Sequence, residues 1–178
     1  MKSLNNWMKT DTLRILGVDT SLRSTGVGML VSDGIRHRVS SYGTIAAPKS
    51  WPLSRCLSNL HLRIREVIDS EKPDQIAIEG IFFCKNVKTA VILGEARGVV
   101  IATCAAAGLD IIEYAPRRVK QSIVGRGAAD KSQVAFMVKN LLGLDSVPPD
   151  DAADALAIAY CHAISLRGVS GTEGCKTL

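Results

Sequence analysis

Short apolar runs and longer amphipathic segments alternate along the chain. Runs rich in Val, Ile and Gly occupy residues 14–19, 24–31 and 35–45, and a turn at residues 32–34 separates the last two. This pattern predicts three antiparallel strands. Apolar side chains then recur at helical spacing over residues 51–70, which predicts an amphipathic helix.

The rest of the chain alternates between the two kinds of element. Two further strands are predicted at residues 75–79 and 110–114. Four further helices are predicted at residues 86–107, from Pro116, at 130–142 with Asp130 as N-cap, and from 150 to about 166. Three antiparallel strands followed by alternating helices and strands predict an α/β fold, in which a five-stranded mixed sheet gains its later strands in parallel and is flanked by helices.

The length and composition indicate one folded domain. The chain has 178 residues, of which 47% are hydrophobic, so wholesale disorder is excluded. We expect the domain to cover residues 14–166, with flexible extensions at residues 1–13 and 167–178, because the ends contain no segment that would join a core. Met8 is a second candidate for the first residue.

Other features narrow the class of protein. The apolar run 98–109 is shorter than the roughly 20 residues that cross a membrane, and no secretory signal is recognisable, so we expect a cytoplasmic protein without a membrane span. Five scattered cysteines favour buried thiols over a disulfide scaffold or a zinc site. The net charge of +5 permits a polyanionic partner without requiring one.

Four carboxylates carry the candidate chemistry. Asp19 and Glu79 each end an apolar strand, at the sheet edge where open α/β folds place ligands, while Asp151 and Asp154 share one face of an Ala-rich helix. Acids brought together repel one another, so a cluster of this kind favours Mg²⁺ or Mn²⁺. Two such ions hydrolyse phosphodiesters without a protein nucleophile. The alternative is that the helix acids only stabilise the helix N-terminus and that Glu79 simply ends its strand.

Four motifs in order resemble the RuvC family of Holliday junction resolvases. They are ILGVD with STGVG in residues 15–28, IAIEGIF with LGEARG in residues 76–98, YAP to KSQV in residues 114–134, and DAADALA in residues 151–157. The likeness covers residues 15–163 and implies an RNase H-like fold. It also implies an endodeoxyribonuclease that cuts junctions by paired symmetric hydrolysis during recombination and DNA repair.

The resemblance implies roles for particular residues. Asp19, Glu79, Asp151 and Asp154 match the catalytic acids that bind two Mg²⁺ ions per site, with Mn²⁺ as a substitute. Lys120 and Lys131 match basic residues important for activity, and Lys131 is counted among the catalytic residues. The residues expected to contact DNA are Phe82, which would stack on bases, together with Lys85, Arg97, Arg117, Arg118, Lys120 and Lys131. The chain departs from the family at Thr20-Ser21, where Pro-Gly is usual, and at Val27, where an aromatic is usual, which leaves the turn geometry open.

Two symmetric cuts need two active sites, so a homodimer is expected. The helix at 86–107 is the candidate interface, and the alternative is burial of this helix within one chain. Family partners would be the branch-migration proteins RuvA and RuvB, and the site of action the nucleoid.

Three other functions compete with this interpretation. Another RNase H-like nuclease acting on a different branched or hybrid nucleic acid would use the same acids. An ATP-handling protein of the actin and sugar-kinase type has a similar phosphate-binding hairpin, but it needs a second related domain that this length does not hold. A non-catalytic DNA-binding subunit is disfavoured by the complete set of acids.

Overall fold

One mixed sheet forms the centre of the molecule. The computed structural model describes residues 12–80, 86–125, 129–166 and 175–178. The sheet order is β3-β2-β1-β4-β5-β6, and β1, β2 and β3 are antiparallel while β4 and β5 run parallel to β1. The strands are β1 (Leu13–Asp19), β2 (Ser24–Ser32), β3 (His37–Ala46), β4 (Gln75–Glu79), β5 (Asp110–Tyr114) and β6 (Cys175–Thr177).

The sixth strand corrects the predicted count of five. Strand β6 pairs antiparallel with β5, matching Tyr114 to Cys175 and Ile112 to Thr177, and the Leu178 amide donates to the Ile111 carbonyl at 3.0 Å. This segment was expected to lie in the C-terminal extension. Three residues are too few to show an alternating pattern, and the pairing is made by backbone groups, so the sequence carries no signal for it.

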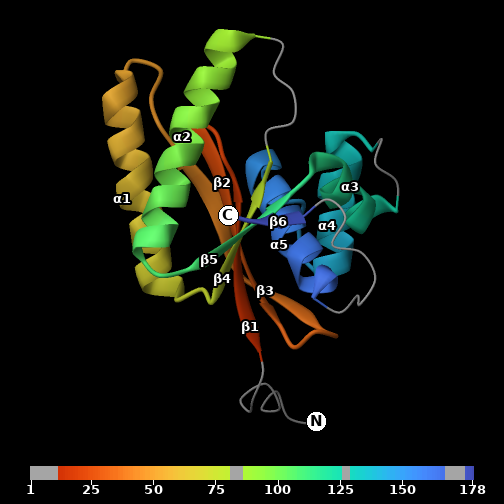
Figure 1. The fold of residues 1–178 in the computed structure, drawn as a ribbon. Helices are drawn as coiled ribbons and strands as arrows, with labels where there is room; N and C mark the ends of the chain where they lie inside the picture. The colour runs from red at the N-terminus through yellow and green to blue at the C-terminus, as the bar shows by residue number, and fades with distance from the viewer. Residues whose placement is uncertain (1–11, 81–85, 126–128, 167–174) are drawn as a thin grey trace.

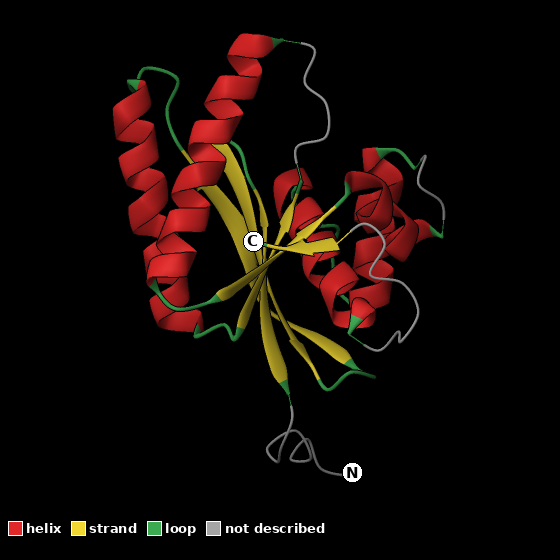
Figure 2. Ribbon diagram, viewed as in Figure 1, coloured by secondary structure: helices red, strands yellow, loops and turns green. Residues whose placement is uncertain are grey.

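Helices cover both faces of the sheet (Figures 1 and 2). Helices α1 (Leu53–Glu71) and α2 (Val87–Ala106) lie on one face, and α3 (Pro116–Val124), α4 (Lys131–Leu142) and α5 (Asp150–Ser165) lie on the other. Because successive side chains of a strand point to opposite faces, β1 contributes Ile15 to the core under α5 and Leu16 to the core under α1 and α2.

The residues at the helix ends have the capping and turn roles expected of their types. Pro116 occupies the first turn of α3, where its missing N–H costs nothing. Asp130 caps α4 in a capping box, in which its carboxylate accepts from the Gln133 amide at 2.8 Å. The chain leaves α2 through Gly108, whose φ of 74° is open to glycine at little cost.

Helix α5 lies directly on the backbone of β1 and β2. A Cβ added at Gly17 would lie 2.0 Å from the Ala155 carbonyl oxygen, and one added at Gly26 would lie 1.8 Å from the Asp151 carbonyl oxygen. Only glycine permits this approach. The first turns of α5 are thereby held against the ends of β1 and β2.

Helix α2 has an unusual composition for a surface helix. Within the described residues it is the one helix whose 20 residues are long and apolar enough to span a membrane, and 28% of that stretch is buried. No membrane span is expected from the sequence, because the continuous apolar run 98–109 is too short to cross a bilayer. Glu95 and Arg97 lie within this helix, and α2 packs against α1 and β5, so it forms part of the folded domain with an apolar outer face.

Candidate active site

Asp19 and Glu79 are brought together by the parallel pairing of β1 and β4. The register matches Val18 with Ile78, which places the next residue of each strand, Asp19 and Glu79, at the same edge of the sheet. The preceding residues are buried apolar side chains, so each carboxylate is the first polar group after a core strand. This confirms that the two strand-ending acids meet.

The two acids of α5 approach the same edge. Asp154 lines a pocket of about 260 Å³ together with Asp19 and Glu79. Asp151 lies one turn earlier, where its carboxylate accepts a hydrogen bond from the Ser24 hydroxyl of β2. Three of the four predicted acids therefore share one pocket, and the fourth is held beside it by β2.

Two lysines predicted from the sequence face these carboxylates. Lys131, the first residue of α4, donates from Nζ to Asp154 Oδ2 at 3.1 Å. Lys120 of α3 lines the same pocket. In Figure 1 helices α3 and α4 stand beside α5 on one side of the sheet, which is how residues distant in sequence surround one pocket. Both lysines lie where a phosphate entering the pocket would need positive charge.

The carboxylates hold protons more tightly than usual. Burial, reinforced by the charges of Asp154 and Asp151, raises the pKa of Asp19 from 3.8 to about 6, although Lys131 opposes the shift. Burial and the charges of Asp19 and Asp154 raise the pKa of Glu79 from 4.5 to about 7. The two lysines thus neutralise only part of the negative charge.

The chemical nature of these side chains suits a divalent cation. The pocket offers carboxylate oxygens, the ligands that Mg²⁺ prefers, and the raised pKa values of Asp19 and Glu79 mean that a cation would relieve their repulsion. In the part of the chain that the structure describes, no three acidic, histidine or cysteine side chains are grouped as a complete metal site. Asp154 instead holds the Lys131 ammonium.

The turn between β1 and β2 uses hydroxyl groups where the family usually has Pro-Gly. The Ser24 amide donates to the Ser21 hydroxyl at 3.1 Å, and the Ser21 amide donates to the Thr25 hydroxyl at 3.2 Å. The Thr25 hydroxyl in turn donates to the Ser21 carbonyl. These bonds close the turn locally and keep Ser24 next to Asp151.

The remaining predicted DNA-contacting residues differ in placement. Arg117 is exposed on α3, and Arg118 reaches the Ser165 hydroxyl of α5 at 3.5 Å. Arg97 is 9% exposed and donates to the Glu79 carbonyl at 2.7 Å, so its guanidinium is engaged inside the protein. Phe82 and Lys85 lie outside the described residues.

Sequence reasoning missed two residues near the site. Glu113 of β5 forms an ion pair with Arg97, and Ser24 holds Asp151. An acid inside the apolar strand 110–114 was a signal that a buried cation lies opposite. Ser24 offered no signal, because its role depends on how closely α5 approaches β2.

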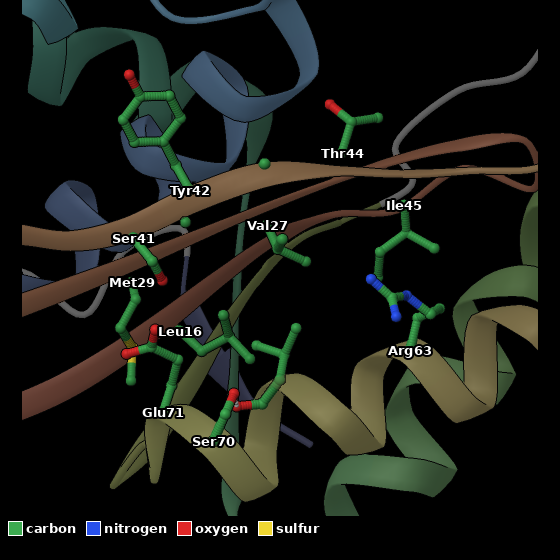
Figure 3. Close-up of a pocket in the computed structure, with 13 residues that line it drawn as sticks. Leu16, Val27, Met29, Ser41, Tyr42, Thr44, Ile45, Arg63, Ser70 and Glu71 are labelled. Carbon is green, nitrogen blue, oxygen red and sulfur yellow. Dashed lines mark hydrogen bonds between the residues drawn. The ribbon is translucent and has the colours of Figure 1, made fainter.

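A second pocket, of about 200 Å³, lies away from these acids between the sheet and α1. Figure 3 shows Leu16, Val27 and Met29 of the sheet facing Ser70 and Glu71 of α1. Glu71 is already paired with Arg14, so this pocket carries no cluster of acids comparable to that around Asp19.

Comparison with known proteins supports the sequence resemblance. The family model described as crossover junction endodeoxyribonuclease RuvC matches residues 15–162. A relative of that description from Caldicellulosiruptor saccharolyticus is 48% identical over 159 residues, covering 88% of this chain and 96% of the relative. Another from Syntrophomonas wolfei is 42% identical over 166 residues, covering 93% and 96%.

The fold also matches a solved structure. T. thermophilus RuvC in complex with Holliday junction substrate aligns with a TM-score of 0.82 at 32% identity, covering 87% of this chain and 95% of that chain. Fold, motifs and sequence identity therefore agree over nearly the whole described domain.

Proposed function

Because the chain belongs to the RuvC family of crossover junction endodeoxyribonucleases, its activity is the resolution of Holliday junctions, and we propose that four acids at one edge of the sheet form the metal-binding catalytic centre. These acids are Asp19, Glu79, Asp151 and Asp154. The single observation that carries the assignment is that Asp19, Glu79 and Asp154, from three separate elements, line one pocket.

We infer that the metal is Mg²⁺, with two ions per site and Mn²⁺ as a substitute. The nucleases of this family are metal-dependent. Oxygen-only ligands favour these hard cations over zinc or copper. When bound, such ions activate a water molecule and stabilise the leaving oxygen of a phosphodiester. The raised pKa values of Asp19 and Glu79 support the assignment, since both carboxyls must lose their protons to ligate.

The chain's own residues then have distinct tasks. Asp19 and Glu79 are held at the sheet edge by β1 and β4, and Ser24 orients Asp151 through its hydrogen bond. Lys131 occupies Oδ2 of Asp154, and an ammonium released from that carboxylate would be placed to bind a phosphate oxygen. Lys120 adds a second positive charge to the lining of the pocket.

DNA contacts are proposed for basic residues around this pocket. Lys120, Arg117 and Arg118 lie on α3, so a duplex whose phosphate enters the pocket passes along this helix. Phe82 and Lys85 follow Glu79 closely in sequence, and we retain Phe82 as the residue that stacks on bases near the junction centre and Lys85 as a DNA contact. Binding through phosphates should weaken as salt concentration rises.

A homodimer is proposed through α2. Exposed small and apolar residues recur at helical spacing along one stripe of this helix, namely Val87, Val91, Gly94, Gly98, Ala102 and Ala105. A stripe of this kind lets a second helix approach closely, and two active sites related by symmetry suit two symmetric cuts. The domain would comprise residues 14–166 together with the edge strand β6, act in the cytoplasm at the nucleoid, and cooperate with RuvA and RuvB.

The test is cleavage of a synthetic four-way junction. End-labelled junction and a matched linear duplex are incubated with protein in Mg²⁺ or in EDTA, and nicks are mapped on every strand. Paired symmetric nicks in the junction alone, abolished by EDTA, are expected. Cleavage of an RNA–DNA hybrid or of the linear duplex instead would favour the other RNase H-like nuclease.

Asp154→Asn tests the site itself. It should abolish cleavage while leaving junction binding in EDTA intact, because it removes a pocket carboxylate without a change of shape. Asp145→Asn is the matched control, since it makes the same charge change at an exposed acid that does not line the 260 Å³ pocket. Retained cleavage by Asp154→Asn would remove Asp154 from the centre.

A further inference from the structure

Arg97 connects three elements at the edge of the active site. It projects from α2, and its Nη1 donates to the backbone carbonyl of Glu79 at 2.7 Å. Its Nη2 donates to the carboxylate of Glu113 on β5. One guanidinium therefore bridges α2, the last residue of β4 and the neighbouring strand β5.

The surroundings of this guanidinium are crowded. The amide of Gly80 donates to the Tyr114 carbonyl at 2.8 Å, which keeps the chain paired with β5 beyond the end of β4. A Cβ added at Gly80 would lie 3.1 Å from the Glu113 carboxylate, so the Glu113 side chain packs directly over the Gly80 backbone. Arg97 and Glu113 thus enclose the peptide that follows Glu79.

The burial of Arg97 decides whether its guanidinium binds a DNA phosphate or holds groups within the protein. The side chain of Arg97 is 11% exposed and that of Glu113 is 25% exposed. A buried guanidinium is tolerated only when it is paired and hydrogen-bonded, and separating it from Glu113 to bind a phosphate would leave that acid without its cation. The geometry therefore does not suit Arg97 as a DNA contact.

We propose that Arg97 and Glu113 are positioning residues, which fix the backbone at Glu79 so that its carboxylate stays aimed into the pocket. The inference rests on the proposed role of Glu79 as a metal ligand. Arginine is required because its planar fork binds a carbonyl and a carboxylate together, whereas lysine presents a single ammonium group.

The test compares Arg97→Gln, Arg97→Lys and the double variant Arg97→Gln with Glu113→Gln. The double variant avoids leaving the partly buried Glu113 carboxylate without its cation, so it remains informative if Arg97→Gln alone folds poorly. Arg14→Gln is the matched control. Arg14 makes the same kind of bridge, to the Glu71 carbonyl at 2.7 Å and the Glu71 carboxylate at 3.1 Å, at the far end of β1.

Three quantities are measured. They are the single-turnover cleavage rate of a four-way junction as a function of Mg²⁺ concentration, junction affinity in EDTA at several salt concentrations, and the rise in unfolding midpoint caused by Mg²⁺ without DNA. Loss of a residue that orients a metal ligand typically costs about 10- to 100-fold in metal affinity or activity. The Arg97 variants should therefore need about tenfold more Mg²⁺ or more in both Mg²⁺ assays, while junction affinity and its salt dependence stay unchanged.

Three results overturn the inference. Weaker junction binding with a salt slope reduced by about one would make Arg97 a phosphate contact. If Arg14→Gln raises the Mg²⁺ requirement by the same factor, the rise in the Arg97 variants reflects general destabilisation. If all Arg97 variants keep the parent's Mg²⁺ requirement, Arg97 has no positioning role. If the parent protein cuts no junction, the proposed function fails, while the Mg²⁺-dependent unfolding midpoint still tests Arg97.

Discussion

Replacing Asp19 by Asn should stabilise the protein in the absence of metal. Burial and neighbouring acids raise the pKa of Asp19 from 3.8 to about 6. A tenfold change in proton affinity is worth about 1.4 kcal/mol, so a folded protein that must ionise this carboxyl loses about 3 kcal/mol of unfolding free energy. Asn has nearly the same shape and carries no charge, so Asp19→Asn recovers that loss.

The gain in unfolding free energy from Asp19→Asn should increase as pH rises. Well below pH 3.8 the carboxyl is protonated in both states, and parent and variant should be equally stable. As pH rises from about 4 to about 6, the unfolded chain releases the proton while the folded chain retains it, so the parent loses stability. The advantage of Asp19→Asn therefore grows over this window, is about half complete near pH 5, and is nearly constant above about pH 7.

Urea unfolding in EDTA at pH 5 and pH 8 measures this gain. Asp145→Asn serves as control, because it removes an exposed charge and should change stability by less than about 0.5 kcal/mol. Adding Mg²⁺ should narrow the difference, since the metal binds and stabilises the parent more than the variant. If Asp19→Asn unfolds at the same urea concentration as the parent at pH 8, or at a lower one, the reasoning is refuted that the uncompensated negative charge of Asp19 destabilises the folded protein.

Other consequences concern the same site and its scaffold. Because the pKa of Glu79 is about 7 and that of Asp19 about 6, the single-turnover cleavage rate at limiting Mg²⁺ should rise about tenfold from pH 6 to pH 7, more steeply below pH 6, and level off above pH 7. Gly26→Ala places a Cβ 1.8 Å from the Asp151 carbonyl oxygen and should cost about 3 kcal/mol or more in urea unfolding, whereas Gly43→Ala meets no atom within 4 Å and should cost little. Asp130→Ala removes the capping box of α4 and should cost about 1 kcal/mol in the same assay; an unchanged midpoint would contradict the cap.

Features of the fold that depend on local pattern were predictable from the sequence. The strands ending at Asp19 and Glu79 are continuous apolar runs, and the helix that carries Asp154 begins at a Pro-Pro-Asp signal. Parallel strands align their carboxyl ends, so the meeting of the two strand acids followed from strand type and order alone.

Features that depend on distance in three dimensions were not predictable. Strand β6 is three residues long and is held by backbone pairing. Ser24 lies 127 residues from Asp151 in sequence, and only the close approach of α5 to β2 joins them. In both cases the local sequence is typical of an ordinary loop or hairpin. The partner residue that gives the segment its role is brought to it only by the packing of the folded chain.

Arg97 illustrates why a charged residue in an apolar helix is ambiguous. Within the sequence, it is one basic residue among many in a protein that binds DNA, and contact with phosphate is the simplest use. The use that we propose follows from Glu113, a partly buried acid on strand β5 that pairs with the Arg97 guanidinium. Because α2 also bears the proposed dimer surface, the residue that steadies Glu79 belongs to the helix through which a second subunit would act.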